Sequence, residues 1–324
     1  MTENLTGQLP LHTLETNEPE GLAFCVEREA KLKGGMRLRK PNGEIAIALN
    51  NSLVSDFLTC KLLFLERQVH MLQRKGKNID QSFGGAIHEG LATYYTSGRA
   101  VLAAQEAFLA TFEDMAEEDT KTRANGLKLL VGYHERWEQE GWEILEVETP
   151  ILFQYGPEDY FVVIPDMVVK SNGRIYGVEH KTSRYTVDQA FYNRFKMDPQ
   201  ITAEAAGIKA KFGMCDGVII NPITIQKGGR SGRPSPYLQY GPRDICNRSQ
   251  EDIDWWRKDM REVHKEIQKV VAEGYYVADK RNCSSFKNPC EFFRLHESHG
   301  NELIKREEYH ERSRNPRTRG VPEE

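Results

Sequence analysis

The segment YFVVIPDMVVKSNGRIYGVEHKT, residues 160–182, decides the fold of this chain. It contains two runs rich in Val, Ile, Tyr and Phe, and the Ser-Asn-Gly sequence at 171–173 between them is typical of a tight turn. A run of similar composition, residues 142–155, precedes this segment, and the turn sequence Gly-Pro-Glu-Asp at 156–159 separates the two. We therefore predict an antiparallel meander with strands over residues 142–155, 160–170 and 174–181.

Two acidic residues and one lysine of this segment are placed so that they can meet. Side chains alternate across a strand, so Glu179 and Lys181 point to the same face of the third strand. Asp166 lies on the preceding antiparallel strand, where the register allows it to face Glu179. Two converging carboxylates repel each other unless a cation lies between them, and Mg²⁺ and Mn²⁺ prefer oxygen ligands. Such a site suits phosphodiester hydrolysis, because the metal ion activates a water molecule and the lysine stabilises developing charge.

The same residues also have a simpler interpretation. An aspartate that follows a proline is often only a turn residue, and a Glu-x-Lys sequence on a strand is often a solvated salt bridge. The other motifs of the chain, taken in order, have to decide between the two interpretations.

Composition and charge exclude several classes of protein. The chain has 324 residues, of which 39% are hydrophobic and 28% are charged, which is enough for a sizeable core. The net charge of -4 does not fit a small, strongly basic nucleic-acid-binding domain, although it allows an enzyme with a local basic groove. We find neither a secretory signal nor an apolar stretch that could span a membrane. We therefore expect no membrane association and a cytoplasmic location, in the host cytoplasm for a phage-encoded protein.

Helical patterns flank the predicted strands along the chain. Apolar residues recur at helical spacing before the meander, and a long amphipathic helix follows it. The predicted helices cover residues 52–73, 86–95, 99–118, 124–139, 199–212 and 252–271, and further strands cover 216–225 and 237–240. This order predicts an α/β fold with a mixed sheet core flanked by helices and a helical N-terminal region.

Four motifs, in order, resemble the RecB-like branch of the PD-(D/E)xK nuclease superfamily, which includes the CRISPR-associated and AddB-type exonucleases. The sequence GGAIH at 84–88 resembles the Gly-x-x-x-His helix start of that branch. Asp166 matches its first acidic motif, EHKT at 179–182 matches its Glu-x-Lys-Thr motif, and PQITA at 199–203 resembles the helix that follows. The resemblance covers about residues 52–296.

The resemblance implies a restriction-endonuclease-like fold and metal-dependent hydrolysis of DNA. It also implies a Mg²⁺ or Mn²⁺ ion held by His88, Asp166 and Glu179. Catalytic roles are then expected for Asp166, Glu179, Lys181 and Gln200. Taken alone, His88 would more simply be a helix-surface or core histidine, and the order of the motifs is what favours the ligand role.

Two positions depart from the family pattern. The usual glycine before the first aspartate is Pro165, and Glu204 stands where a tyrosine is common, which puts the DNA contact of that helix in doubt. Glu148, on the first predicted strand, is more simply interpreted as a strand-surface residue than as an addition to the metal site.

The cysteines suggest a second metal-binding group. The same nuclease branch often carries a [4Fe–4S] cluster, and Cys60, Cys283 and Cys290 match three of its four ligand positions. His296 stands at the fourth. Three thiolates and one nitrogen would equally suit structural zinc, and a third interpretation is that the cluster has been lost and leaves free thiols. A bound group would join the C-terminal segment to the N-terminal helices.

Several basic residues are candidates for contacts with DNA phosphates, although a solvated surface is the simpler interpretation of any one of them. These candidates are Arg74, Lys75, Lys77, Arg230 and Arg233.

The sequence therefore predicts a metal-dependent DNA nuclease, most specifically an exonuclease in recombination, repair or phage DNA processing. Its expected partners are DNA and a recombination or replication protein. One alternative is a non-catalytic nuclease-like module that binds DNA or protein, and another is a structural metal- or cluster-binding protein with incidental carboxylates. The expected organisation is a loose extension over 1–45, a nuclease domain over 46–300 and a charged tail over 301–324. The parts of that domain are a helical part over 50–140, an α/β core over 141–245, and a C-terminal helix with the cluster segment over 250–297.

Overall fold

The computed structural model describes residues 33–39, 45–76, 78–115, 120–157, 159–226, 237–273, 280–283 and 289–312. The chain divides into two compact units. Unit 1 consists of Met1–Gly76, Gln154–Val162 and Arg257–Glu324, and unit 2 consists of Lys77–Phe153 and Val163–Trp256. Among the described helices, none combines the length and the apolar composition that crossing a membrane would require.

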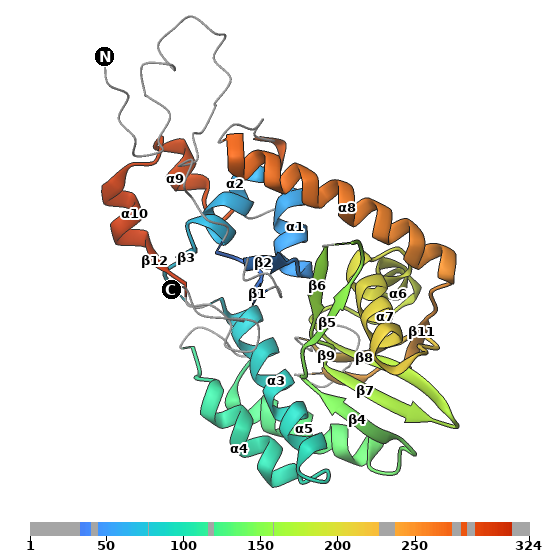
Figure 1. The fold of residues 1–324 in the computed structure, drawn as a ribbon. Helices are drawn as coiled ribbons and strands as arrows, with labels where there is room; N and C mark the ends of the chain where they lie inside the picture. Colours follow the sequence, from blue (N-terminus) through green and yellow to red (C-terminus); the bar gives the residue numbers. More distant parts are fainter. Residues whose placement is uncertain are drawn as a thin grey trace, which may run out of the picture. The chain divides into compact units, whose positions relative to one another are not determined.

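Unit 2 is built on a mixed sheet (Figure 1). Within the described residues the sheet has six strands, in the order β10-β9-β8-β7-β4, and β11 pairs with β9 off this path. Strands β8 and β9 are parallel, and the other neighbours are antiparallel. The strands are β4 (Glu143–Val147), β7 (Met167–Ser171), β8 (Arg174–Ser183), β9 (Val218–Gln226), β10 (Tyr237–Tyr240) and β11 (Asp244–Cys246).

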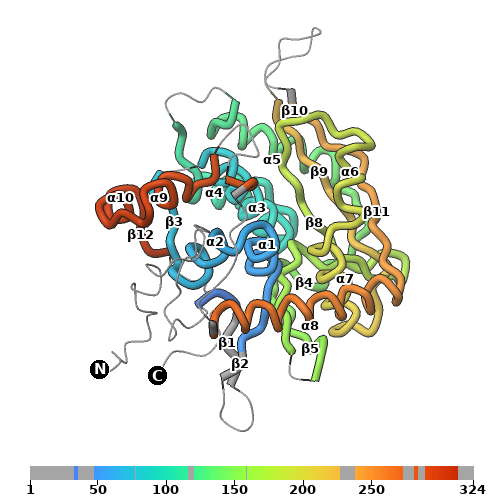
Figure 2. Tube along the Cα trace, turned by 90° about the horizontal axis from the view of Figure 1, so that it is seen from above, coloured from blue at the N-terminus to red at the C-terminus, as the bar shows by residue number. Residues whose placement is uncertain are grey.

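Helices cover both faces of this sheet, which confirms the predicted α/β class (Figures 1 and 2). Helices α3, α4 and α5 share one apolar core with Met167, Val178 and Ile223 of the sheet. Helices α6 and α7 share a second core with Val218 and Ile220, which point to the other face because side chains alternate along β9. The helices are α3 (Ile79–Thr96), α4 (Val101–Thr111), α5 (Arg123–Trp137), α6 (Gln189–Lys196) and α7 (Pro199–Phe212).

The predicted meander is only partly correct. The turn between β7 and β8 forms as expected, with positive φ angles at Asn172 and Gly173. However, β4 pairs directly with β7, while β5 (Ile151–Gln154) and β6 (Tyr160–Val163) pair with each other in a separate two-stranded sheet. The first two predicted strands are each interrupted near a proline, Pro150 and Pro165, and proline cannot donate a hydrogen bond to a strand ladder.

Unit 1 contains short helices and strands from both ends of its sequence. They are β1 (Met36–Arg39), β2 (Ile45–Ala48), α1 (Asn51–Thr59), α2 (Lys61–Phe64), a π-helical turn (Leu65–Val69), β3 (Leu72–Arg74), a 3₁₀ turn (Lys280–Cys283), α9 (Phe293–Glu297), α10 (Glu302–Glu308) and β12 (Tyr309–Glu311). Helix α8 (Gln250–Glu273) begins in the sequence of unit 2 and ends in that of unit 1.

Two sequence expectations in unit 1 differ from the structure. The helix predicted over 52–73 is interrupted at Cys60, whose backbone is extended, and its last residues form β3, which pairs with β12. Pairing with a segment far away in the sequence overrides the local helical pattern there. For the same reason, the first part of the predicted charged tail is ordered as α10 and β12, and Tyr309 is buried in a stack with Phe292.

Candidate active site

Three side chains of unit 2 converge on one point that could hold a metal ion. His88, Glu148 and Asp166 each offer a ligand atom, and these atoms all lie within 4.8 Å of one another. The Nδ1 atom of His88, on α3, lies 3.1 Å from Oδ1 of Asp166. Glu148 and Asp166 come from two neighbouring interruptions of the sheet, after β4 and before β7.

The interruptions hold both carboxylates in place through backbone contacts. Val147 lies opposite Met167 in the register, and beyond that pair the N–H of Glu148 donates to the carbonyl oxygen of Asp166 at 3.0 Å. Glu148 has a φ of 48°, in the left-handed region that non-glycine residues rarely adopt and that is often found at functional sites. The backbone N–H of His180 donates to Oδ2 of Asp166 at 2.6 Å.

Glu179, Lys181 and Gln200 lie beside this group. Glu179 and Lys181 are on the face of β8 that α7 covers, and Lys181 Nζ donates to Glu179 Oε1 at 2.6 Å. Gln200, at the start of α7, donates from Nε2 to the same oxygen at 3.0 Å. The structure therefore brings together the five residues predicted from the family motifs. Glu179 stands next to the three converging ligand atoms rather than among them.

Burial and the neighbouring charges shift the pKa values of the site residues. Burial raises the pKa of Glu179 to about 7, and the negative charge of Asp166 adds to that rise. Burial alone would lower the pKa of His88, but the adjacent carboxylate of Asp166 raises it to about 9. Burial would raise the pKa of Asp166 as well, yet the charge and hydrogen bond of His88 hold it below its usual value. A divalent cation would relieve the repulsion among the carboxylates.

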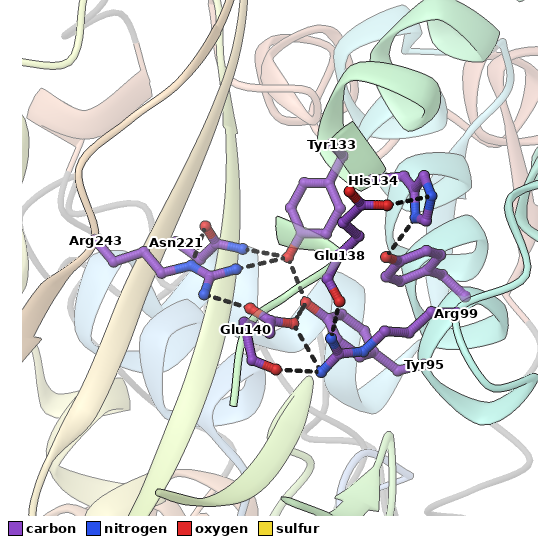
Figure 3. A network of polar contacts seen from close by, with 9 residues as sticks. Tyr95, Arg99, Tyr133, His134, Glu138, Glu140, Asn221 and Arg243 are labelled. Carbon is purple, nitrogen blue, oxygen red and sulfur yellow. Dashed lines mark hydrogen bonds and ion pairs between the residues drawn. The ribbon is translucent and has the colours of Figure 1, made fainter. Parts of the chain in front are cut away.

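A buried polar network, drawn in Figure 3, reaches His180, whose side chain lies on the face of β8 opposite to that of Glu179 and Lys181. Asn221 of β9 places its Nδ2 atom 2.8 Å from both Nδ1 of His180 and the hydroxyl of Tyr133. Arg243 fixes the orientation of that amide, because its Nε donates to Asn221 Oδ1 at 3.1 Å. Arg243 also pairs with Glu140 through Nη1 and Oε2, at 2.5 Å. The network thus supports His180, whose backbone N–H binds Asp166.

None of the candidate phosphate contacts belongs to the described residues of unit 2. Arg74 and Lys75 belong to unit 1, where Arg74 lies 4.0 Å from Glu308 and Lys75 Nζ donates to the carbonyl oxygen of Arg306 at 2.8 Å. Lys77, Arg230 and Arg233 lie outside the described residues.

The predicted cluster ligands of unit 1 are brought together in part. Burial raises the pKa of the Cys290 thiol, and the charges of Cys283 and Cys60 also raise it, so these three side chains are neighbours. The N–H of Cys290 donates to the carbonyl oxygen of Cys283 at 2.9 Å. His296, at the fourth position, is engaged by Glu66, whose Oε1 lies 3.3 Å from Nε2 of the ring. The three cysteines are therefore neighbours in unit 1, while the imidazole has a protein partner.

Comparison with known proteins places the chain in a family. No curated protein matches it. Two solved structures are similar at 13% identity. One, named "Putative exonuclease", is from Eubacterium rectale, with a TM-score of 0.41 over 76% of this chain and 92% of that one. The other is SSO0001, with a TM-score of 0.28 over 66% of this chain and 82% of that one. Residues 48–294 match the sequence pattern of a nuclease superfamily, and the chain therefore belongs to the PD-(D/E)XK nuclease superfamily.

Proposed function

We propose that this chain is a metal-dependent DNA nuclease, most specifically an exonuclease. Membership of the superfamily implies a phosphodiester hydrolase. The observation that carries the proposal is the convergence of His88, Glu148 and Asp166 next to the Glu179–Lys181 pair. A role in recombination, repair or phage DNA processing, a protein partner and a cytoplasmic location stay predictions.

The proposed site residues fit a hard divalent ion such as Mg²⁺ or Mn²⁺. Two carboxylates and one imidazole offer ligand atoms close together, and Glu179 adds a third carboxylate beside them. When bound, the ion would activate a water molecule and offset charge on the phosphate. His88, Glu148 and Asp166 hold the ion in this proposal, and Glu179 completes the site. Lys181, kept charged by Glu179, stabilises negative charge that develops on the phosphate oxygens.

The proposed activity is tested by degradation of end-labelled DNA. Wild-type protein is incubated with linear double-stranded DNA, single-stranded DNA, covalently closed circular DNA and RNA, with Mg²⁺, with Mn²⁺ and with EDTA. We expect metal-dependent release of nucleotides from the linear DNA and none from the closed circle. Cutting of the circle would contradict the exonuclease role. Tight DNA binding without cleavage would favour the non-catalytic module instead.

Metal binding should tighten as pH rises. His88, with a pKa of about 9, has to lose its proton before Nδ1 or Nε2 can bind a metal ion. Below that pKa the apparent affinity gains roughly tenfold per pH unit for each proton released, so we expect about a 100-fold increase between pH 6 and pH 8. Calorimetric titration with Mn²⁺ in buffers of different ionisation enthalpy measures both the affinity and the number of protons released.

Variants of two residues make this titration specific. His88→Gln should abolish most of the pH dependence, and Glu148→Gln should weaken binding at every pH. Glu146→Gln is the matched control, because Glu146 lies two residues away on β4 and pairs with Lys211 instead. An affinity that is independent of pH in the wild type would contradict the role assigned to His88.

We also propose that Cys60, Cys283 and Cys290 hold an iron–sulfur cluster, because thiolates suit such clusters and the three thiols are neighbours. Protein purified without oxygen should be brown, and Cys290→Ala should lose the visible absorption. His296→Ala should keep most of this absorption, because in the wild type the imidazole contacts Glu66. Colourless protein with stoichiometric zinc would contradict the cluster and keep the ligands.

A further inference from the structure

The side-chain amide of Gln200 lies between two carboxylates on the face of β8 that α7 covers. Its Nε2 atom donates to Glu179 Oε1 at 3.0 Å and to Glu204 Oε1, one helical turn further along α7, at 2.9 Å. Both hydrogens of the NH₂ group are therefore used. The same oxygen of Glu179 also accepts from Lys181.

Glu204 is not explained by the stability of the fold. It is 1% exposed, and its Oε2 atom is buried without a hydrogen-bond partner among the described residues. Burying a carboxyl group with one oxygen unsatisfied costs free energy, and an apolar side chain of similar volume is often as stable or more stable. The neighbours of Glu204 on the buried side of α7, Ala203 and Ala205, are apolar.

Glu204 does, however, determine how the Gln200 amide is turned. In the structure the NH₂ group faces an oxygen of each carboxyl group, and a carbonyl oxygen turned toward the carboxylate of Glu179 would meet only an acceptor. Without Glu204, one of the two acceptors is lost, and the remaining acceptor already binds Lys181. The amide could then rotate, and its carbonyl oxygen would no longer have one fixed direction.

We propose that Glu204 is a positioning residue that fixes the Gln200 amide, with its NH₂ group toward Glu179 and its carbonyl oxygen turned away to accept a hydrogen bond from the attacking water. This inference rests on the proposed nuclease function and deepens it. It gives a role to the position at which this chain departs from the family motif. Gln200 then acts through its oxygen, and Glu204 acts only through Gln200.

Kinetics of full-length variants test this order of action. In Glu204→Leu we expect kcat on linear DNA with Mg²⁺ to fall about 10- to 100-fold, the range typical of residues that orient a functional group. In Glu204→Gln, whose amide oxygen can still accept from Gln200, the fall should be smaller. KM for DNA should be unchanged. Gln200→Ala should cause a fall similar to that in Glu204→Leu, and adding Glu204→Leu to it should cause no further loss, since the two residues act as one unit. Multiplying losses in the double variant would overturn the proposal, as would unchanged kcat in both Glu204 variants.

Thermal stability separates positioning from a structural role. Glu204→Leu should have a Tm equal to or above that of the wild type, because it removes a buried carboxyl group. The matched control is Thr202→Val on the same helix, which removes the buried hydroxyl that accepts from Arg248 at 2.7 Å. That control should lower Tm and leave kcat unchanged. A lower Tm in Glu204→Leu, in step with its lost activity, would make Glu204 structural and overturn the proposal.

A third measurement does not depend on nuclease activity. In metal-free protein labelled with ¹⁵N at glutamine, the two NH₂ hydrogens of Gln200 should exchange slowly with solvent. The exchange should become fast in Glu204→Leu. Unchanged protection in that variant would overturn the proposal even if the wild type cleaved DNA. If protection is lost in Glu204→Leu but the wild type cleaves no DNA, the positioning contact is confirmed and the nuclease function is refuted.

Discussion

Replacing Asp166 by asparagine should abolish metal-dependent DNA degradation, lowering kcat/KM at least about 10³-fold, which corresponds to roughly 4 kcal/mol of transition-state stabilisation. Asp166 offers an oxygen to the proposed metal ion and lies at the centre of the site, since His88, the backbone of His180 and the backbone of Glu148 all contact it. Asparagine keeps the size of the side chain but removes its charge. The measurement is the initial rate of nucleotide release from linear DNA in Mg²⁺.

The matched control is Glu143→Gln on β4. Glu143 is an exposed carboxylate of the same sheet, 3.9 Å from Lys170, and its loss should change the rate by less than about 2-fold because exposed ion pairs contribute little. Asp166→Asn should also bind Mn²⁺ weakly while unfolding at a Tm close to that of the wild type. Activity of Asp166→Asn within tenfold of the wild type would mean that the assigned site is wrong.

The hairpin that carries the nuclease motif could be predicted from the sequence because its information is local. A Ser-Asn-Gly turn between two β-branched runs leaves little choice of register, and period-two alternation then places Glu179 and Lys181 on one face. The converging of Asp166 with His88 was predicted from the order of motifs. The structure adds a contact that holds Asp166 in this position, the hydrogen bond that the backbone N–H of His180 donates to its carboxylate.

Glu148 could not be assigned from the sequence because its role depends on pairing between distant strands. Its neighbours Val147 and Thr149 suggest a continuous strand, in which it would be a surface residue. In the structure the strand stops, Pro150 follows, and Glu148 takes a positive φ opposite the Pro165 interruption. The proline two residues later was the one local signal. The paired interruptions become visible only when β4 is known to lie beside β7.

Glu204 could be noticed as a departure from the motif, but not interpreted. Its contact with Gln200 follows from helical spacing, since residues four apart lie on the same face. Its burial depends on how closely α7 packs on β8, which helical periodicity does not determine. The cysteines are a similar case, because Cys60 is brought to Cys283 and Cys290 only by the folding of unit 1.

The polar network that reaches His180 is another feature that no local pattern predicts, and one arginine connects most of it (Figure 3). The guanidinium of Arg243 lies 3.6 Å from the ring centre of Trp137 and 4.1 Å from that of Trp142. Between these rings it binds Glu140, Asn221 and the hydroxyl of Tyr133. Arginine suits this position because its planar donors serve several acceptors while its faces stack on aromatic rings.

Replacing Arg243 by methionine should therefore destabilise the fold by about 3–5 kcal/mol, the range for removing one partner of a buried ion pair. The carboxylate of Glu140 would stay buried, with its side chain only 5% exposed, and would keep Arg99 at 3.6 Å and the Tyr95 hydroxyl at 2.6 Å as partners. These partners place the expected loss toward the lower end of the range. Urea unfolding followed by circular dichroism measures it.

Replacing the carboxylate of Glu140 as well should recover part of the stability lost in Arg243→Met. In the double variant Arg243→Met with Glu140→Gln, no buried carboxylate is left uncompensated, so it should be more stable than Arg243→Met alone. Lys170→Met, at an exposed ion pair, should cost less than about 1 kcal/mol. A double variant less stable than Arg243→Met would show that Glu140 contributes through its hydrogen bonds to Tyr95 rather than through its charge. The network would then support His180 and Asp166 as a neutral scaffold, with Arg243 acting mainly by its stacking between the two tryptophans.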